Sequence, residues 1–149
     1  MKTLTLAAAL ALLSAPAFAE SHMVAPTGDA AAGEAQFARQ CVACHVVVND
    51  AGETLAGRNA HVGPNLYKVA HRVPGTYPDF DYGDSLIAVG ERGEPWNEEM
   101  FVGYVQDPTG WLRATLEDRR ARGKMAFQVR DEQQARDIYA YLDSLAPME

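Results

Sequence analysis

The sequence predicts an all-α fold in which about five short helices are joined by long loops. Apolar residues recur at helical spacing, as in the stretch that contains Met100, Phe101, Tyr104 and Val105. Residues that favour helix N-termini stand before several such stretches. No long run alternates between apolar and polar residues, which is the pattern of strands with one buried face. The length of 149 residues fits one domain.

Residues 1–19 have the organisation of a secretory signal peptide. Lys2 supplies the positive start, residues 4–13 form the apolar stretch, and residues 17–19 read A-F-A, a small-residue cleavage site. The apolar stretch is too short to span a bilayer, which favours cleavage over retention as an anchor. The sequence therefore predicts an exported protein whose single domain covers residues 20–149.

The first helix of this domain is expected to begin after Thr27 or Asp29, either of which can cap it, and to end near Cys41. Gly33 lies inside this helix, where glycine costs about 1 kcal/mol relative to alanine. We therefore expect Gly33 to allow close packing against another helix. Phe37 follows one turn later on the same face.

Residues 41–45 read C-x-x-C-H, the attachment signature of a c-type haem. The spacing of Cys41 and Cys44 places both thiols on one turn of chain, where they can form thioethers with the two vinyl groups of a porphyrin. His45 follows directly and can bind iron from the same side. These are the only two cysteines of the chain. Export agrees with this prediction, because c-type haem is attached outside the cytoplasm, and the bacterial periplasm is the expected location.

Two other interpretations of the cysteine pair remain. A thiol–disulfide redox site expects a βαβ context, which the sequence does not show. A structural zinc site needs four ligands, so His61 or His71 would have to complete it, although such sites usually have tighter spacing in their second half.

Four further helices are expected after the motif. Asn97 and Asp131 can cap two of them, and Pro108 suits the first position of a third. The expected ranges are Gly83–Val89, Asn97–Asp107, Pro108–Arg120 and a last helix from Asp131 to Pro147. The last helix has an apolar stripe formed by Ala135, Ile138, Tyr139, Tyr141, Leu142 and Leu145.

The predicted helices carry too few apolar side chains for a conventional core of a domain this size. A haem at the centre would supply the missing apolar mass. Residues 46–61 form a loop, and Val46-Val47-Val48 within it are expected to pack on the haem rather than to form a short strand.

The formal net charge of −7 argues against nucleic acid or an anionic membrane surface as partner. One segment, residues 113–124, is basic. It contains Arg113, Arg119, Arg120, Arg122 and Lys124 against Glu117 and Asp118. We expect this segment to form a basic rim around an exposed haem edge, with the acidic residues elsewhere.

Several motifs occur together between residues 29 and 145. They are Gly33-x-x-x-Phe37, C-x-x-C-H, Gly63-Pro64-Asn65-Leu66-Tyr67, Arg72-x-x-Gly75, Trp96, Tyr104-x-x-Asp107-Pro108, Lys124-Met125-x-Phe127 and Asp137-Ile138-Tyr139-Ala140-Tyr141-Leu142. In this order the set resembles the class I cytochromes c, specifically the longer bacterial members close to mitochondrial cytochrome c. The resemblance implies a cytochrome c fold around one covalently bound haem c.

The resemblance also assigns roles to individual residues. His45 and Met125 match the two iron ligands, and Pro64 matches the residue whose carbonyl orients the histidine ring. Tyr104 matches a tyrosine near the ligand sulfur. Arg72, Tyr82 and Trp96 match positions that contact the haem propionates. On the residues alone, Arg72 can instead be solvated and the two aromatic residues can be core.

Met125 is also the methionine best placed by the sequence itself. Met23 lies in the expected N-terminal tail, Met148 lies beyond the last helix, and Met100 lies on the apolar side of a helix where a core role suffices. Met125 lies in non-helical chain beside a glycine, where the backbone can aim the sulfur at iron. Without the resemblance, packing in the core remains an alternative role.

Iron with both axial positions occupied has no open site, so the expected function is one-electron exchange by a soluble, monomeric periplasmic carrier rather than an enzyme. The donor would be a complex such as a quinol–cytochrome c oxidoreductase, and the acceptor an oxidase, a reductase or a photosynthetic reaction centre. The alternative is a haem enzyme, or a sensor of gas or peroxide, in which Met125 leaves the iron. His61 and His71 are weaker candidates for iron ligands.

Overall fold

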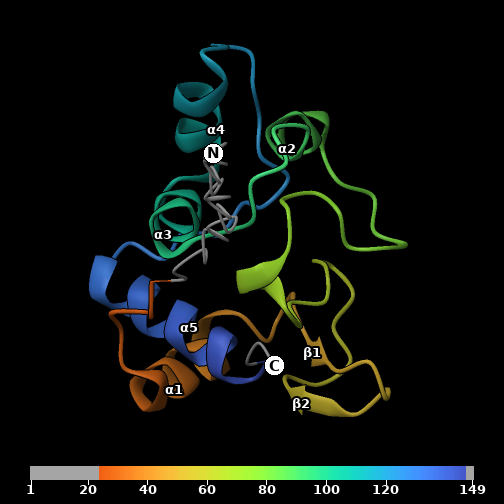
Figure 1. The fold of residues 1–149 in the computed structure, drawn as a ribbon, viewed down its shortest axis with the longest axis vertical. Coiled ribbons are helices and arrows are strands. Elements are labelled where there is room, and N and C mark those ends of the chain that lie inside the picture. Colours follow the sequence, from red (N-terminus) through yellow and green to blue (C-terminus); the bar gives the residue numbers. More distant parts are fainter. Residues whose placement is uncertain (1–23, 147–149) are drawn as a thin grey trace, which may run out of the picture.

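Five α-helices, one turn of 3-10 helix and one two-stranded hairpin make up the part of the chain that the computed structural model describes, residues 24–146 (Figure 1). The expected signal peptide and the helix stop at Pro147 lie outside these residues. In chain order the elements are α1 (Ala30–Gln40), β1 (Val47–Val48), β2 (Thr54–Ala56), η1 (Val69–His71), α2 (Asp84–Gly90), α3 (Glu98–Gln106), α4 (Pro108–Leu116) and α5 (Glu132–Ser144). The all-α prediction with five helices is therefore confirmed.

Side-chain caps fix where most of these helices begin. Asp29 accepts hydrogen bonds from the backbone of α1, which decides between the two expected caps. Asn97 and Asp131 cap α3 and α5 in the same way, and Asp107 caps α4, whose first residue is Pro108. Each cap satisfies backbone N–H groups that the helix itself leaves unpaired.

Two local predictions are wrong. The fourth helix ends at Leu116 rather than near Arg120, because Glu117 adopts a left-handed backbone with φ of 54° and stops it. The valines at 46–48 do not line the central cavity described below. Val47 and Val48 form β1, which pairs antiparallel with β2 in a short hairpin.

Helices α1 and α5 cross at very close range in the lower part of Figure 1. The crossing point is Gly33, where a Cβ atom would overlap the carbonyl oxygen of Asp137 and lie 2.8 Å from Cβ of Tyr141. Phe37 packs beside it, with its ring centroid 5.7 Å from that of Tyr141. The close packing expected of Gly33 is confirmed.

The remaining helices complete a shell around the centre of the molecule. Helix α3 packs on α5, where the rings of Phe101 and Tyr139 lie 5.4 Å apart. Helices α2 and α4 pack on each other at the opposite end from α1 (Figure 1). The expected apolar stripe of α5 is buried up to Leu142, and Leu145 packs against the same core while partly exposed.

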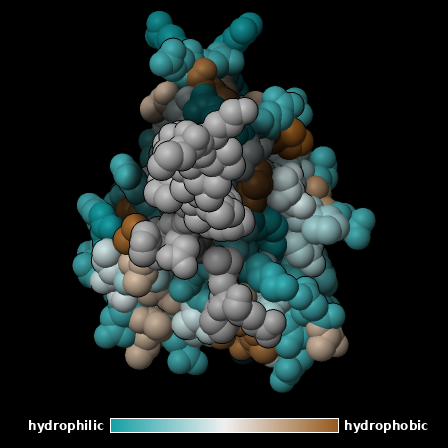
Figure 2. All heavy atoms as spheres, in the orientation of Figure 1, coloured by the Kyte–Doolittle hydropathy of each residue, from teal (hydrophilic) through white to brown (hydrophobic). Residues whose placement is uncertain are grey.

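Where the described residues are visible in Figure 2, the outer surface is largely polar with scattered hydrophobic residues. Within residues 24–146, no helix combines the length and the apolar character that crossing a membrane requires.

Candidate haem site

A cavity of about 890 Å³ occupies the centre of the fold. Its volume lies near the upper end of the range of about 300–1,000 Å³ that is typical of ligand pockets. The nine side chains that the motif and the resemblance assigned to haem binding all line this one cavity, although they come from widely separated parts of the chain. They are Cys41, Cys44, His45, Pro64, Arg72, Tyr82, Trp96, Tyr104 and Met125.

The C-x-x-C-H motif lies directly after α1 and forms a tight turn. The backbone N–H groups of Cys44 and His45 both donate to the carbonyl oxygen of Cys41, at 3.1 and 2.9 Å. Burial, with a smaller contribution from neighbouring Cys44, raises the pKa of the Cys41 thiol to about 12. A thiol held neutral in this way disfavours the thiolate on which both disulfide exchange and zinc binding depend.

The two other histidines of the described chain lie apart from the motif. His61 Nε2 lies 2.9 Å from Oδ1 of Asn59, and His71 Nε2 lies 3.2 Å from Oδ1 of Asp143. Neither lines the cavity. Within residues 24–146, no group of three or more His, Cys, Asp or Glu side chains is placed to hold a metal ion.

The ring of His45 is oriented by the loop that faces it. Nδ1 lies 2.9 Å from the carbonyl oxygen of Pro64, and because a carbonyl only accepts, Nδ1 is the nitrogen that carries the proton. Gly63 lies against the ring so closely that a Cβ atom there would overlap it. Burial lowers the pKa of His45, which keeps the imidazole neutral. The Nε2 lone pair is therefore the one available to a metal.

Arg72 is a half-buried cation whose closest partners are backbone carbonyls. Its guanidinium donates to the carbonyl oxygens of Tyr67 at 2.8 Å and Asn65 at 2.9 Å, and it stacks on the ring of Tyr77 at 4.9 Å. Burial lowers its pKa, and no ion pair joins it to a carboxylate within residues 24–146. Withdrawing a charge from water is costly unless the charge is paired. The carboxylate of a haem propionate would offset this cost.

Asn65 and Tyr77 support Arg72, although neither residue was expected to have a role. The Asn65 side chain accepts from the backbone of Val48 and Tyr67, both at 3.0 Å, and donates to the Val48 carbonyl and the Tyr77 hydroxyl. It thereby fixes the loop whose carbonyl holds the guanidinium. The available signal was an asparagine directly after Gly63-Pro64, because asparagine side chains commonly hydrogen-bond to nearby backbone groups in loops.

An aromatic cluster contributes Trp96 and Tyr104 to the wall of the cavity. The Trp96 ring lies 5.4 Å from that of Tyr104 and 5.8 Å from that of Trp111. Burial raises the pKa of Tyr104 to about 12, with a smaller contribution from Tyr82. Both the walls and the buried polar groups therefore suit a large, mostly apolar group with an anionic edge.

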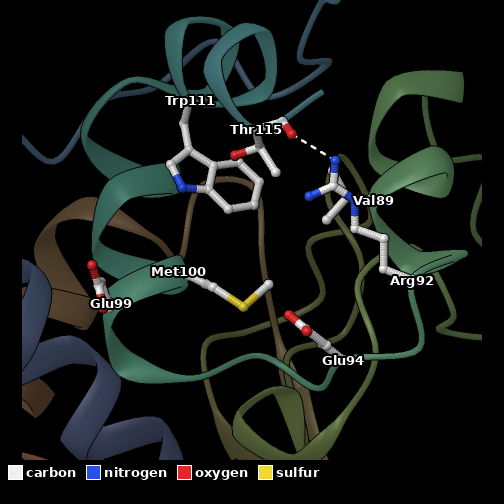
Figure 3. Close-up of a pocket in the computed structure, with 7 residues that line it drawn as sticks. All are labelled: Val89, Arg92, Glu94, Glu99, Met100, Trp111 and Thr115. Atoms are coloured by element: carbon white, nitrogen blue, oxygen red, sulfur yellow. Dashed lines mark hydrogen bonds between the residues drawn. The ribbon is translucent and has the colours of Figure 1, made fainter. Parts of the chain in front are cut away.

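Met125 lines this cavity from an irregular segment between α4 and α5. Met100 does not. It lies in a separate hollow of about 190 Å³ beside Trp111, where Arg92 donates to the Thr115 carbonyl (Figure 3). Of the methionines in residues 24–146, only Met125 faces the cavity that contains His45.

The basic segment reaches the cavity only at its end. Arg122 and Lys124 line the cavity, and Arg113 instead donates to the carbonyl of Ala121. Asp81 also lines the cavity, so the expectation that acidic residues lie elsewhere is wrong at this position. Arg39 adds a further cation from the end of α1.

Comparison with known proteins agrees with this architecture. The family model for cytochrome c matches residues 30–146. Cytochrome c2 of Rhodovulum adriaticum is 62% identical over 119 residues, which cover 80% of this chain and 94% of the relative. Cytochrome c2 of Cereibacter sphaeroides is 47% identical over 137 residues, covering 91% of this chain and 94% of the relative.

Solved structures give the same result for the fold. The crystal structure of cytochrome c2 from Rhodobacter sphaeroides superposes with a TM-score of 0.78 at 47% identity, covering 82% of this chain and 99% of that chain. The five-helix arrangement is thus the cytochrome c fold. The chain belongs to the class I cytochromes c, in the cytochrome c2 family, whose members are electron carriers rather than enzymes and hold one covalently bound haem c.

Proposed function

We propose that this chain is a periplasmic one-electron carrier in which Cys41 and Cys44 hold the haem, and His45 and Met125 ligate its iron. The observation that carries this proposal is the convergence of all four side chains on one cavity. When bound there, a haem supplies a reversible ferric/ferrous couple.

The protein's own residues set how that couple behaves. His45 would offer Nε2 to the iron while the Pro64 carbonyl holds its other ring nitrogen, and Met125 would supply a thioether from the segment between α4 and α5. Two protein ligands leave no coordination position for a substrate, and a methionine ligand favours the ferrous state. The buried walls, which include Leu86, Phe101 and Leu142, act in the same direction because an apolar surround disfavours an extra positive charge.

The rim of the cavity carries the features of a docking surface for acidic redox partners. Arg39, Arg122 and Lys124 outnumber the single rim carboxylate of Asp81. Two exposed apolar side chains, Val62 at 75% and Phe127 at 47%, also line the cavity. Candidate partners are a quinol–cytochrome c oxidoreductase as donor, and an oxidase, a reductase or a photosynthetic reaction centre as acceptor. Rates with such a partner should fall as salt is added, and rates that stay flat or rise would contradict this docking mode.

Absorption spectroscopy of the purified ferric protein tests the ligand set. The weak far-red band that reports sulfur bonded to iron should be present at neutral pH and absent from Met125→Ala. Met100→Ala is the matched control and should keep the band, because Met100 lies in the separate hollow. A band that survives Met125→Ala would assign the ligand elsewhere.

Mass spectrometry tests attachment and export together. The protein from the periplasmic fraction should begin at Glu20 and carry the mass of one haem. A periplasmic polypeptide with the mass of its amino acids alone and two reactive thiols would contradict the proposal.

A further inference from the structure

Lys124 bridges the rim of the cavity immediately beside Met125. Its Nζ donates to the backbone carbonyl of Asp81 and to the Asp81 carboxylate, both at 2.8 Å. The two residues are 43 positions apart, and both line the cavity. The aliphatic part of Lys124 lies over Gly83, where an added Cβ atom would be 3.3 Å from Cγ of the lysine.

The two residues before Lys124 are anchored as well. The Arg122 N–H donates to the hydroxyl of Ser85 at 3.1 Å, and the Gly123 N–H donates to the hydroxyl of Thr109 at 3.1 Å. Residues 122–124 are thus hydrogen-bonded to α2, to α4 and to the loop before α2, respectively. The next backbone hydrogen bond to another element comes after the methionine, from Val129 to Val105.

We propose that the Lys124–Asp81 bridge, supported by Ser85 and Thr109, is a clasp that holds the segment bearing Met125 closed over the iron. These are positioning residues, since they act through the backbone that presents the sulfur. The inference rests on the proposed ligation by Met125. An external ligand can take the methionine's place only when the segment moves outward, and that movement breaks the bridge.

The size of the effect follows from the exposure of the bridge. The Lys124 side chain is 53% exposed and that of Asp81 is 96% exposed. Exposed ion pairs contribute only modestly to stability, so loss of the bridge should speed opening about two- to fivefold. Lys124→Met removes both hydrogen bonds, whereas Asp81→Ala leaves the bond to the backbone carbonyl and should have the smaller effect.

Imidazole binding to the ferric holoprotein is the direct test, at a pH where free imidazole is neutral and at saturating concentration. The rate at which the far-red band disappears should be about two- to fivefold higher in Lys124→Met than in the native protein. Lys68→Met is the matched control, because Lys68 makes a similar exposed bond to Asp50, at 2.5 Å, and does not line the cavity. This control should bind imidazole at the native rate.

A double variant and hydrogen exchange complete the test. Lys124→Met combined with Asp81→Ala should behave like Lys124→Met alone, and the amides of Arg122 and Gly123 should exchange faster in Lys124→Met. Equal imidazole rates in Lys124→Met and Lys68→Met, or in Lys124→Met and the native protein, would overturn the clasp. A native protein without the far-red band would overturn the Met125 ligation on which the clasp rests, so the two failures are distinguishable.

Discussion

Replacing Gly33 by alanine tests the close crossing of α1 and α5 with the smallest possible change. The added methyl group would overlap the carbonyl oxygen of Asp137 and crowd Cβ of Tyr141. A backbone carbonyl inside a helix cannot turn aside as a flexible side chain can. The two helices must therefore separate, and the contact between Phe37 and Tyr141 must loosen with them.

The expected magnitude is the difference between two opposing effects. Overpacking of a tight core costs about 1–3 kcal/mol, and the backbone contact at Gly33 favours the upper end. Alanine regains about 1 kcal/mol of helix propensity relative to glycine. The net loss in the free energy of unfolding should be about 2 kcal/mol, which lowers the melting temperature by about 8 °C for a domain of this size.

Guanidinium unfolding of the ferric holoprotein, followed by far-ultraviolet circular dichroism, measures this loss. Ala35→Gly is the matched control, because Ala35 is exposed on the same helix and reports the Ala–Gly exchange without the crossing. It should lose about 1 kcal/mol. A Gly33→Ala protein as stable as the native one, or more stable, would mean that propensity acts unopposed and that the helices do not meet at this residue.

Two further predictions concern polar groups that are partly or fully buried. Arg72→Met should lower the free energy of unfolding by about 1–3 kcal/mol, because the carbonyls of Asn65 and Tyr67 lose their donors; unchanged denaturation midpoints would contradict this. Burial raises the pKa of Tyr139 to about 12, so between pH 10 and 12 the unfolded state gives up a proton that the folded state keeps, and stability falls with rising pH. Tyr139→Phe should reduce this fall by at most about 1.4 kcal/mol per pH unit, and parallel stability curves for the two proteins would argue against it.

The helices could be predicted from the sequence because their signals are local. Asp29, Asn97 and Asp131 stand where the backbone needs acceptors, and Pro108 stands where a missing N–H costs nothing. The end of α4 was not predictable in this way. A left-handed backbone at a stopping position usually signals itself by glycine or asparagine, whereas here the residue is Glu117.

The hairpin of β1 and β2 was not predicted, because its strands are too short to show an alternation of apolar and polar residues. Strand β1 has two residues and β2 has three, and Gly52, with φ of 81°, lies in the turn between them. Its position depends instead on Asn65, whose side chain pairs with the backbone of Val48. A contact between residues 17 positions apart leaves no periodic pattern in the sequence.

The site likewise has one part that a local sequence signal predicts and other parts that depend on residues distant in the sequence. The attachment motif can be read from residues 41–45 alone, because its spacing is part of its chemistry. The rest of the site was indicated only by resemblance, since Arg72, Trp96 and Met125 reach the cavity from separate loops and helices. Neither the motif nor the resemblance predicted the hydrogen bonds that hold the Arg72 guanidinium. Its partners are backbone carbonyls, whose position depends on the loop conformation.

The volume of the cavity implies that this fold depends on the group that fills it. Without that group, the apolar side chains that line a space of about 890 Å³ would lose their packing partners. Entry of water would reduce this loss, yet the net stability of a domain is only about 5–15 kcal/mol. Cys41→Ala combined with Cys44→Ala, which removes both attachment points, should therefore yield a chain with little helical circular dichroism in the absence of haem. A native-like helical spectrum and cooperative unfolding in that variant would show that the polypeptide shell is stable by itself.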